Sequence, residues 1–147
     1  MCKISDWLKP PKALVEYEIA SVDLLSLIRL TYPKALVFLD DNRYYYVSHE
    51  DWGTVIRDVL LNMPAYLTEK FDCENVSNLC RCRTSSIYKI NTMGEAVGPS
   101  PWGYHAFNLF VSVVGGEPKL FILEPQSGDI YTVEEDSGYS IDRLVMG

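Results

Sequence analysis

The second half of the sequence is divided into short β-type runs by glycine-containing breaks, and this division constrains the fold most. Residues 105–114 (HAFNLFVSVV), 119–125 (KLFILEP) and 129–134 (DIYTVE) are rich in β-branched and aromatic residues, with breaks at 115–116 and 127–128. An earlier run, 86–93 (SIYKINTM), precedes a longer break at 94–103. Because short connections join antiparallel neighbours, we expect a meander over this half.

The first half shows helical spacing instead. Ser21 is placed to cap a short helix that ends at Tyr32, before Pro33. A second helix is predicted over 48–63, where Ser48 and Asp51 resemble a capping box and Trp52 begins an apolar face. Between these helices, 35–48 (ALVFLDDNRYYYVS) has the composition of a hairpin that turns at residues 40–42.

A third helix is predicted to begin at Asp72, whose carboxylate can cap the free N–H groups and which leaves Cys73 in the first turn. The fold class is therefore α+β, with helices of the N-terminal half packed on an antiparallel sheet formed mainly by the C-terminal half. A length of 147 residues, with no repeat or low-complexity tract, favours a single domain over 1–147.

Charge and hydropathy exclude several classes of protein. The net charge of −7 and the scattered basic residues disfavour nucleic acid as a partner. There is no apolar run of the roughly 20 residues that span a bilayer and no secretory signal, so we expect no membrane partner. The four cysteines, at 2, 73, 80 and 82, are irregularly spaced, which favours reduced thiols and a cytoplasmic location.

The stretch FDCEN, residues 71–75, raises the question of whether Cys73 is a nucleophile. A helix N-terminus favours the thiolate, because the unpaired N–H groups and the helix dipole stabilise negative charge. Free cysteine is also among the most commonly buried residue types, so this position alone leaves an inert thiol as the stronger interpretation.

The register of the next two strands brings a base and an acid together. His105, one of two histidines, begins the run 105–114, and Glu124 ends the run that follows the turn at 115–116. Counting outward from this turn makes the two residues cross-strand neighbours, with allowance for a bulge. A carboxylate that binds one imidazole nitrogen leaves the other free to accept a thiol proton.

These three motifs resemble those of papain-like and transglutaminase-like cysteine enzymes. FDCEN is similar to the motif that opens the catalytic helix, GYHAFN to the histidine strand and LEP to the acid strand. The nearest likeness, over about 32–125, is to the C-terminal cysteine-protease domain of a mushroom agglutinin and its bacterial and phage relatives. The resemblance implies a nucleophile at Cys73, a general base at His105 and an orienting acid at Glu124, acting on a peptide or protein substrate.

The chain departs from the papain pattern at the oxyanion hole. Papain-like proteases place a glutamine before the cysteine, whereas the sole glutamine here is Gln126. Tyr66 or Trp52 would then donate beside the Cys73 N–H group. Trp102, in the segment before His105, is a candidate for a flap over the cleft.

Other interpretations stay open. The acidic residues Asp129, Glu134, Glu135, Asp136 and Asp142 make calcium a weakly supported ligand, and no other cofactor is indicated. A metal site at Cys73, Cys80 and Cys82 is disfavoured because their spacing lacks paired C-x2-C knuckles. The alternative function is a non-catalytic interaction or structural module, for example of a phage or mobile element, that keeps the fold. The oligomeric state is not indicated.

Overall fold

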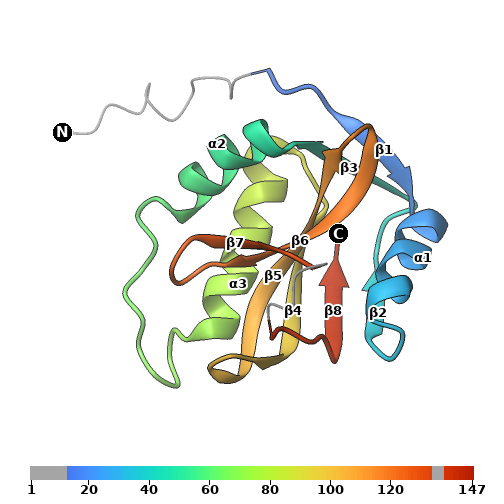
Figure 1. Cartoon of the computed structure of the whole chain (residues 1–147). Helices are drawn as coiled ribbons and strands as arrows, with labels where there is room; N and C mark the ends of the chain where they lie inside the picture. The colour runs from blue at the N-terminus through green and yellow to red at the C-terminus, as the bar shows by residue number, and fades with distance from the viewer. Residues whose placement is uncertain (1–12, 134–137) are drawn as a thin grey trace.

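Figure 1 shows the fold in a computed structural model, which describes residues 13–133 and 138–147. The strands are β1 (Tyr17–Ala20), β2 (Leu36–Leu39), β3 (Arg43–Ser48), β4 (Met93–Ser100), β5 (Gly103–Val114), β6 (Glu117–Glu124), β7 (Asp129–Thr132) and β8 (Arg143–Met146). The helices are α1 (Ser21–Thr31), α2 (His49–Leu60) and α3 (Cys73–Arg83), and a π-helical turn at Thr84–Tyr88 continues α3. The chain is therefore α+β, as predicted.

The described strands form one mixed sheet. Its order is β1-β3-β5-β4-β8-β2, and β6 pairs with β5 and β7. Strands β4, β5, β6 and β7 are antiparallel neighbours, which confirms the meander predicted for the second half. The expectation of an antiparallel sheet is wrong for two pairs, because β3 runs parallel to β5 and β2 runs parallel to β8.

Two predictions about the strands are wrong. Both strands of the predicted hairpin at 35–48 form, but β2 pairs with β8 while β3 pairs with β1 and β5. The run 86–93 begins in the π-helical turn, and β4 occupies most of the predicted break at 94–103. Strands β1 and β8 have no counterpart among the sequence predictions.

A local capping signal sets the start of α2 but not that of α1. Ser48 caps α2 by accepting the Asp51 N–H at 3.2 Å, as predicted. α1 also forms, but Ala20 is its N-cap and Ser21 is its first helical residue, so the predicted Ser21 cap is wrong. The C-cap of α1 is Tyr32, immediately before the proline that was expected to stop it.

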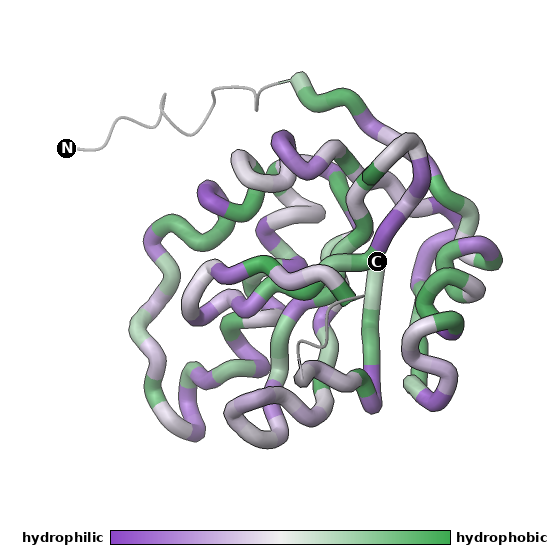
Figure 2. Tube along the Cα trace, viewed as in Figure 1, coloured by the Kyte–Doolittle hydropathy of each residue, from purple (hydrophilic) through white to green (hydrophobic). Residues whose placement is uncertain are grey.

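Apolar residues of the sheet alternate between two cores, one on each face, because successive side chains of a strand point in opposite directions. On one face, α1 packs against Leu109 and Ile122. On the other face, α2 packs against Phe110 and Leu123 and contributes the buried ring of Trp52. Figure 2 shows the corresponding apolar stretches along the central strands.

The helices are short. The longest of those described, α2, has 12 residues, whereas an α-helix needs about 20 to cross a bilayer. No helix in the described part of the chain is long and apolar enough to span a membrane.

Candidate active site

The first turn of α3 presents Cys73 at a helix N-terminus. Asp72 is the N-cap and forms a capping box with Asn75, whose Oδ1 accepts the Asp72 N–H at 3.2 Å. The Cys73 side chain is partly exposed, and its thiol hydrogen-bonds to no residue that the structure describes. The thiol thus lies beside the free N–H groups of the helix, where a negative charge is favoured.

His105 and Glu124 are in direct contact across β5 and β6. The His105 Nε2 and Glu124 Oε2 atoms are 3.0 Å apart, and the two side chains are 11% and 0% exposed. A carboxylate at this nitrogen is satisfied by a donated N–H, which leaves Nδ1 as the free acceptor of the ring. The pair predicted by counting outward from the turn at 115–116 is in contact, but diagonally, because the register places Asn108 opposite Leu123 without a bulge.

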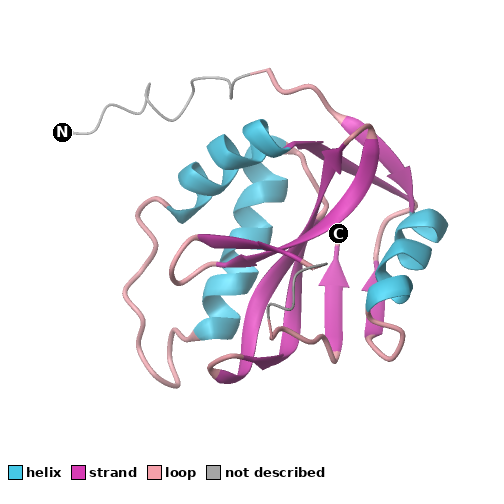
Figure 3. Cartoon of the chain, in the orientation of Figure 1, coloured by secondary structure: helices cyan, strands magenta, loops and turns pink. Residues whose placement is uncertain are grey.

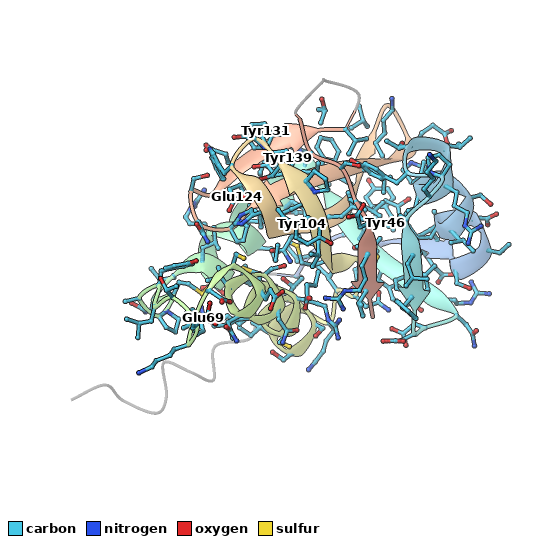
Figure 4. The ribbon with its side chains drawn as sticks, turned by 90° about the horizontal axis from the view of Figure 1, so that it is seen from below. Tyr46, Glu69, Tyr104, Glu124, Tyr131 and Tyr139 are labelled. Atoms are coloured by element: carbon cyan, nitrogen blue, oxygen red, sulfur yellow. The ribbon has the colours of Figure 1, made fainter. Side chains whose placement is uncertain are left out.

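The Glu124 carboxylate is buried but well supplied with donors. Besides His105, the Tyr139 hydroxyl donates to Oε2 at 3.3 Å and the Gln126 backbone N–H donates to Oε1 at 3.1 Å. Hydrogen bonds to both oxygens offset the cost of removing an ionised group from water. Figure 4 shows Glu124 and Tyr139 in the same region of the molecule.

Contacts between α3 and β5 bring Cys73 and His105 to one end of the molecule. One turn into α3, Ser77 donates its hydroxyl to the Phe107 carbonyl at 2.7 Å, and Asn108 Nδ2 donates to the Ser77 carbonyl at 2.9 Å. Ser77 lies four residues after Cys73, and Phe107 lies two residues after His105. These hydrogen bonds therefore place the first turn of α3 close to the start of β5.

A pocket of about 460 Å³ adjoins these residues. The connection between α2 and α3, drawn as a long loop in Figure 3, supplies one wall. The pocket is lined by Leu60, Met63, Pro64, Tyr66, Val76, Pro125, Gln126, Ser127 and Gly128. Val76 lies one helical turn after Cys73, and Gln126 binds Glu124, so the pocket reaches both sides of the site. No charged side chain belongs to this lining.

The other predicted cleft residues have different positions. Trp102 is 60% exposed, and its ring meets the edge of the His105 ring with centroids 5.9 Å apart. Tyr66 is 52% exposed at the pocket. The proposal of Trp52 as an oxyanion donor is wrong, because the indole is fully buried and its Nε1–H donates to the Val111 carbonyl at 2.6 Å.

Two further cysteines, Cys80 and Cys82, belong to the described residues, whereas Cys2 lies outside them. Cys80 is buried in α3, and Cys82 is exposed near the end of that helix. Among the described residues, no three His, Cys, Asp or Glu side chains gather in the way a metal ion requires. Of the residues named for calcium, positions 134–136 lie outside the described part of the chain.

Two residues of the site were not recognised from the sequence. Tyr139 reaches Glu124 from the segment that leads into β8, and Gly98 is the strand partner of His105 on β4. Neither residue belongs to a sequence motif, and Tyr139 lies in a stretch with the composition of a polar tail. Only the tertiary contact with a buried carboxylate identifies it.

Comparisons with known proteins give matches of structure only. No protein-family model and no curated protein matches the chain. The structure of PSL1a in complex with E64 matches with a TM-score of 0.68 and 18% identity, covering 87% of this chain and 51% of that chain. Polyporus squamosus lectin bound to a human-type influenza-binding epitope matches with a TM-score of 0.66 and 17% identity, covering 87% and 49%.

These similarities concern the fold. The chain spans about half the length of the lectin structures it matches, and identities below 20% carry no assignment of activity. The resemblance to a mushroom agglutinin is thus confirmed at the level of the fold: the chain has a papain-like α+β fold like that of the Polyporus squamosus lectin.

Proposed function

We propose that the chain is a thiol-dependent acyl-transfer enzyme, a cysteine peptidase or a transglutaminase-like enzyme, that uses Cys73, His105 and Glu124. The observation that carries this proposal is the buried His105–Glu124 pair beside a helix that begins at Cys73. An imidazole held through Nε2 has Nδ1 available for a thiol, and a thiol at a helix N-terminus is favoured as the thiolate.

The reaction has two stages. The Cys73 thiolate attacks the carbonyl carbon of an amide, and the carbon–nitrogen bond breaks as His105 gives its proton to the leaving amine. The resulting thioester is then attacked by water or by an acceptor amine, with His105 removing the proton of that nucleophile. Water gives a carboxylic acid and makes the protein a peptidase, whereas an amine gives a new amide. In this second stage either nucleophile displaces the Cys73 thiolate, and the proton removed from the nucleophile stays on His105.

The role of Glu124 in this scheme is to hold His105. Its carboxylate fixes the imidazole orientation and stabilises the imidazolium that exists when the thiol is ionised. The Cys73 backbone N–H, at the start of α3, is positioned as one oxyanion donor, and Tyr66 is the candidate for the second.

The test is selective alkylation of Cys73. E64, present in the PSL1a structure, is an epoxide that alkylates activated thiols. We expect E64 at neutral pH to modify Cys73 and to leave Cys82, although Cys82 is exposed. Cys80 should not react, because burial raises the pKa of its thiol to about 12 and keeps it neutral.

Mass spectrometry must resolve neighbouring cysteines. Trypsin leaves Cys73 and Cys80 in one peptide, residues 71–81, so fragment ions are needed to locate the adduct. His105→Ala should abolish E64 labelling while iodoacetamide still labels Cys82. Equal labelling of Cys73 and Cys82 by E64, unchanged by His105→Ala, would contradict the proposal.

A non-catalytic module that keeps the papain-like fold is the second candidate. It is favoured by one observation, that the Cys73 thiol forms no hydrogen bond to His105 in the structure. Catalytic hydrogen bonds often form only with substrate bound, so this geometry does not oppose catalysis. The labelling experiment separates the two candidates, because a binding module has no reason to activate one thiol.

The pocket beside the site predicts the kind of substrate. Its uncharged and largely apolar lining suits a large apolar side chain of a peptide next to the scissile amide. Met63→Glu should raise the KM for such peptides about tenfold, the effect of losing one buried apolar side chain, with little change in kcat. Steady-state kinetics with peptides that differ at one position would measure this.

Thr68→Glu is the matched control for Met63→Glu. Thr68 lies in the same connection, is exposed and does not line the pocket, so the added charge alone should leave KM unchanged. Equal changes in KM for both variants would place the substrate side chain elsewhere.

A further inference from the structure

The segment that leads into β8 crosses the site at β4. Ser140 donates its N–H to the Pro99 carbonyl and Asp142 donates its N–H to the Val97 carbonyl, both at 2.9 Å. The residue between these two acceptors is Gly98, which pairs with His105 in the sheet. Strand β4 therefore pairs with β5, at His105, along one edge and accepts hydrogen bonds from residues 138–142 along the other.

Gly98 permits this close approach. A Cβ atom at position 98 would overlap the carbonyl oxygen of Ser140 and come within 3.0 Å of the Asp142 nitrogen. Both contacts are with backbone atoms, which cannot rotate away as a side chain can. The segment is thus held close against the backbone of β4, and Tyr139 lies immediately before the residue that contacts Gly98.

Tyr139 reaches from this segment to Glu124. Its ring is 9% exposed and packs edge-on against Phe107, with centroids 4.8 Å apart. Its hydroxyl donates to Glu124 Oε2, the same oxygen that contacts His105 Nε2. Burial raises the pKa of Tyr139, and the Glu124 charge raises it further, so the phenol stays protonated and can only be a donor to this carboxylate.

We infer that Tyr139 is a positioning residue that holds the Glu124 carboxylate, and through it the His105 imidazole, in the orientation needed by Cys73. This inference rests on the proposed function for its consequence, but its geometry stands independently. Gln126 fixes Oε1 through the backbone, whereas Tyr139 and His105 share Oε2. Without the Tyr139 hydroxyl, the carboxylate can rotate about its terminal bond and the imidazole is less firmly oriented.

A purely structural role for Tyr139 would lie in its ring. The ring contacts Phe107 and Tyr131, and both contacts persist in Tyr139→Phe. The hydroxyl is the single group that this substitution removes. Any change at His105 in Tyr139→Phe therefore comes from the hydrogen bond to Glu124 and not from lost packing.

Tyr131→Phe is a matched control. Tyr131 packs against Tyr139 with ring centroids 5.6 Å apart, and among the described residues its hydroxyl forms no hydrogen bond to Glu124. After desolvation, the charges of Asp129 and then of Glu124 raise the pKa of Tyr131. The control removes the same atom from the neighbouring ring of the same cluster. It should not affect the orientation of the Glu124 carboxylate.

Imidazole NMR tests the inference without requiring activity. The chain has two histidines, so ¹⁵N-histidine labelling gives signals from His49 and His105 alone. His49 is exposed at the start of α2 and serves as the internal reference. We expect Tyr139→Phe to shift the His105 ring signals and leave those of His49, and Tyr131→Phe to shift neither.

The consequence for reactivity is measured on the same variants. The rate of E64 labelling at Cys73 should fall about tenfold in Tyr139→Phe, the loss expected when one supporting hydrogen bond to a charged group is removed. It should be unchanged in Tyr131→Phe. Unshifted His105 signals in Tyr139→Phe, or equal shifts in both variants, would overturn the inference.

The imidazole NMR and the E64 labelling together also separate this inference from the proposed function. If E64 does not label Cys73 in the unaltered protein, the proposed function fails, while a His105 shift in Tyr139→Phe still shows that Tyr139 positions the pair. If E64 labels Cys73 but Tyr139→Phe changes neither the signals nor the rate, the proposed function stands and the positioning role fails.

Discussion

Glu124→Gln is expected to lower the rate of E64 labelling at Cys73 on the order of a thousandfold. The carboxylate accepts three hydrogen bonds, from His105, Tyr139 and Gln126. An amide has one oxygen and one NH₂ group, so at least one of these donors would face another donor. The imidazolium would also lose its negative partner, and changes of this kind in catalytic triads reduce rates by about three to four orders of magnitude.

The same substitution should reduce stability. A buried donor left without an acceptor costs about 1–3 kcal/mol, so the free energy of unfolding should fall by about that amount. Urea unfolding monitored by tryptophan fluorescence would measure it. The loss of reactivity is expected to be far larger than the loss of folded protein. Labelling rates measured at low urea, where the variant is folded, therefore report the effect on reactivity alone.

Glu117→Gln is the matched control for Glu124→Gln. Glu117 begins the same strand, β6, but is exposed at the turn. The Glu117→Gln variant loses the same charge but leaves no buried donor unpaired. Its labelling rate and its free energy of unfolding should therefore stay close to those of the unaltered protein. An unchanged E64 rate in Glu124→Gln would remove Glu124 from the mechanism.

Gly98→Ala should lower the free energy of unfolding by about 3 kcal/mol, the upper range for overpacking in a core. The added methyl group meets the Ser140 carbonyl oxygen, and either β4 or residues 138–142 must move. Movement of that segment withdraws Tyr139 from Glu124, so the His105 ring signals should shift as they do in Tyr139→Phe. Urea unfolding and imidazole NMR would measure the two effects.

Gly53→Ala is the corresponding control. Gly53 lies within α2, and a Cβ atom there would have no neighbour within 4 Å. Alanine favours helix by up to about 1 kcal/mol over glycine, so this variant should be more stable than the unaltered protein. If both substitutions had the same sign, close approach at Gly98 would not be the cause.

The helices were predictable because their signals are local. The Ser48 cap and the Asp72 capping box act within four residues of chain, and the apolar spacing of α2 repeats every turn. Such interactions depend little on the rest of the molecule. The positions of Cys73 and of the predicted α2 core followed from them.

The strands β2 and β4 show why the sheet was only partly predictable. β2 pairs with β8, a partner at the far end of the sequence, and no local signal indicates that pairing. Gly94 and Gly98 made 94–103 resemble a break, yet both lie in β4. Leu144 and Met146 approach Gly94 closely, as Ser140 approaches Gly98. Glycine there serves close packing, which a sequence pattern does not distinguish from a turn.

The pair of His105 and Glu124 was within reach of sequence reasoning because a short turn fixes the register of β5 and β6. Trp52 was assigned to the wrong place for the opposite reason. An indole N–H can bond to any acceptor in range, and the packing of α2 on the sheet gives it the Val111 carbonyl. Its aromatic character was visible, but its partner was not.

The sequence by itself determined the starts of α2 and α3, the meander from β5 to β7 and the order of cysteine, histidine and acid. Each depends on contacts between residues close in the chain or joined by a tight turn. The tertiary structure alone decided the parallel pairs, the pocket beside the site and the contact of Tyr139 with Glu124. These join segments that are distant in the chain, and their geometry is set by the packing of the whole sheet and its helices.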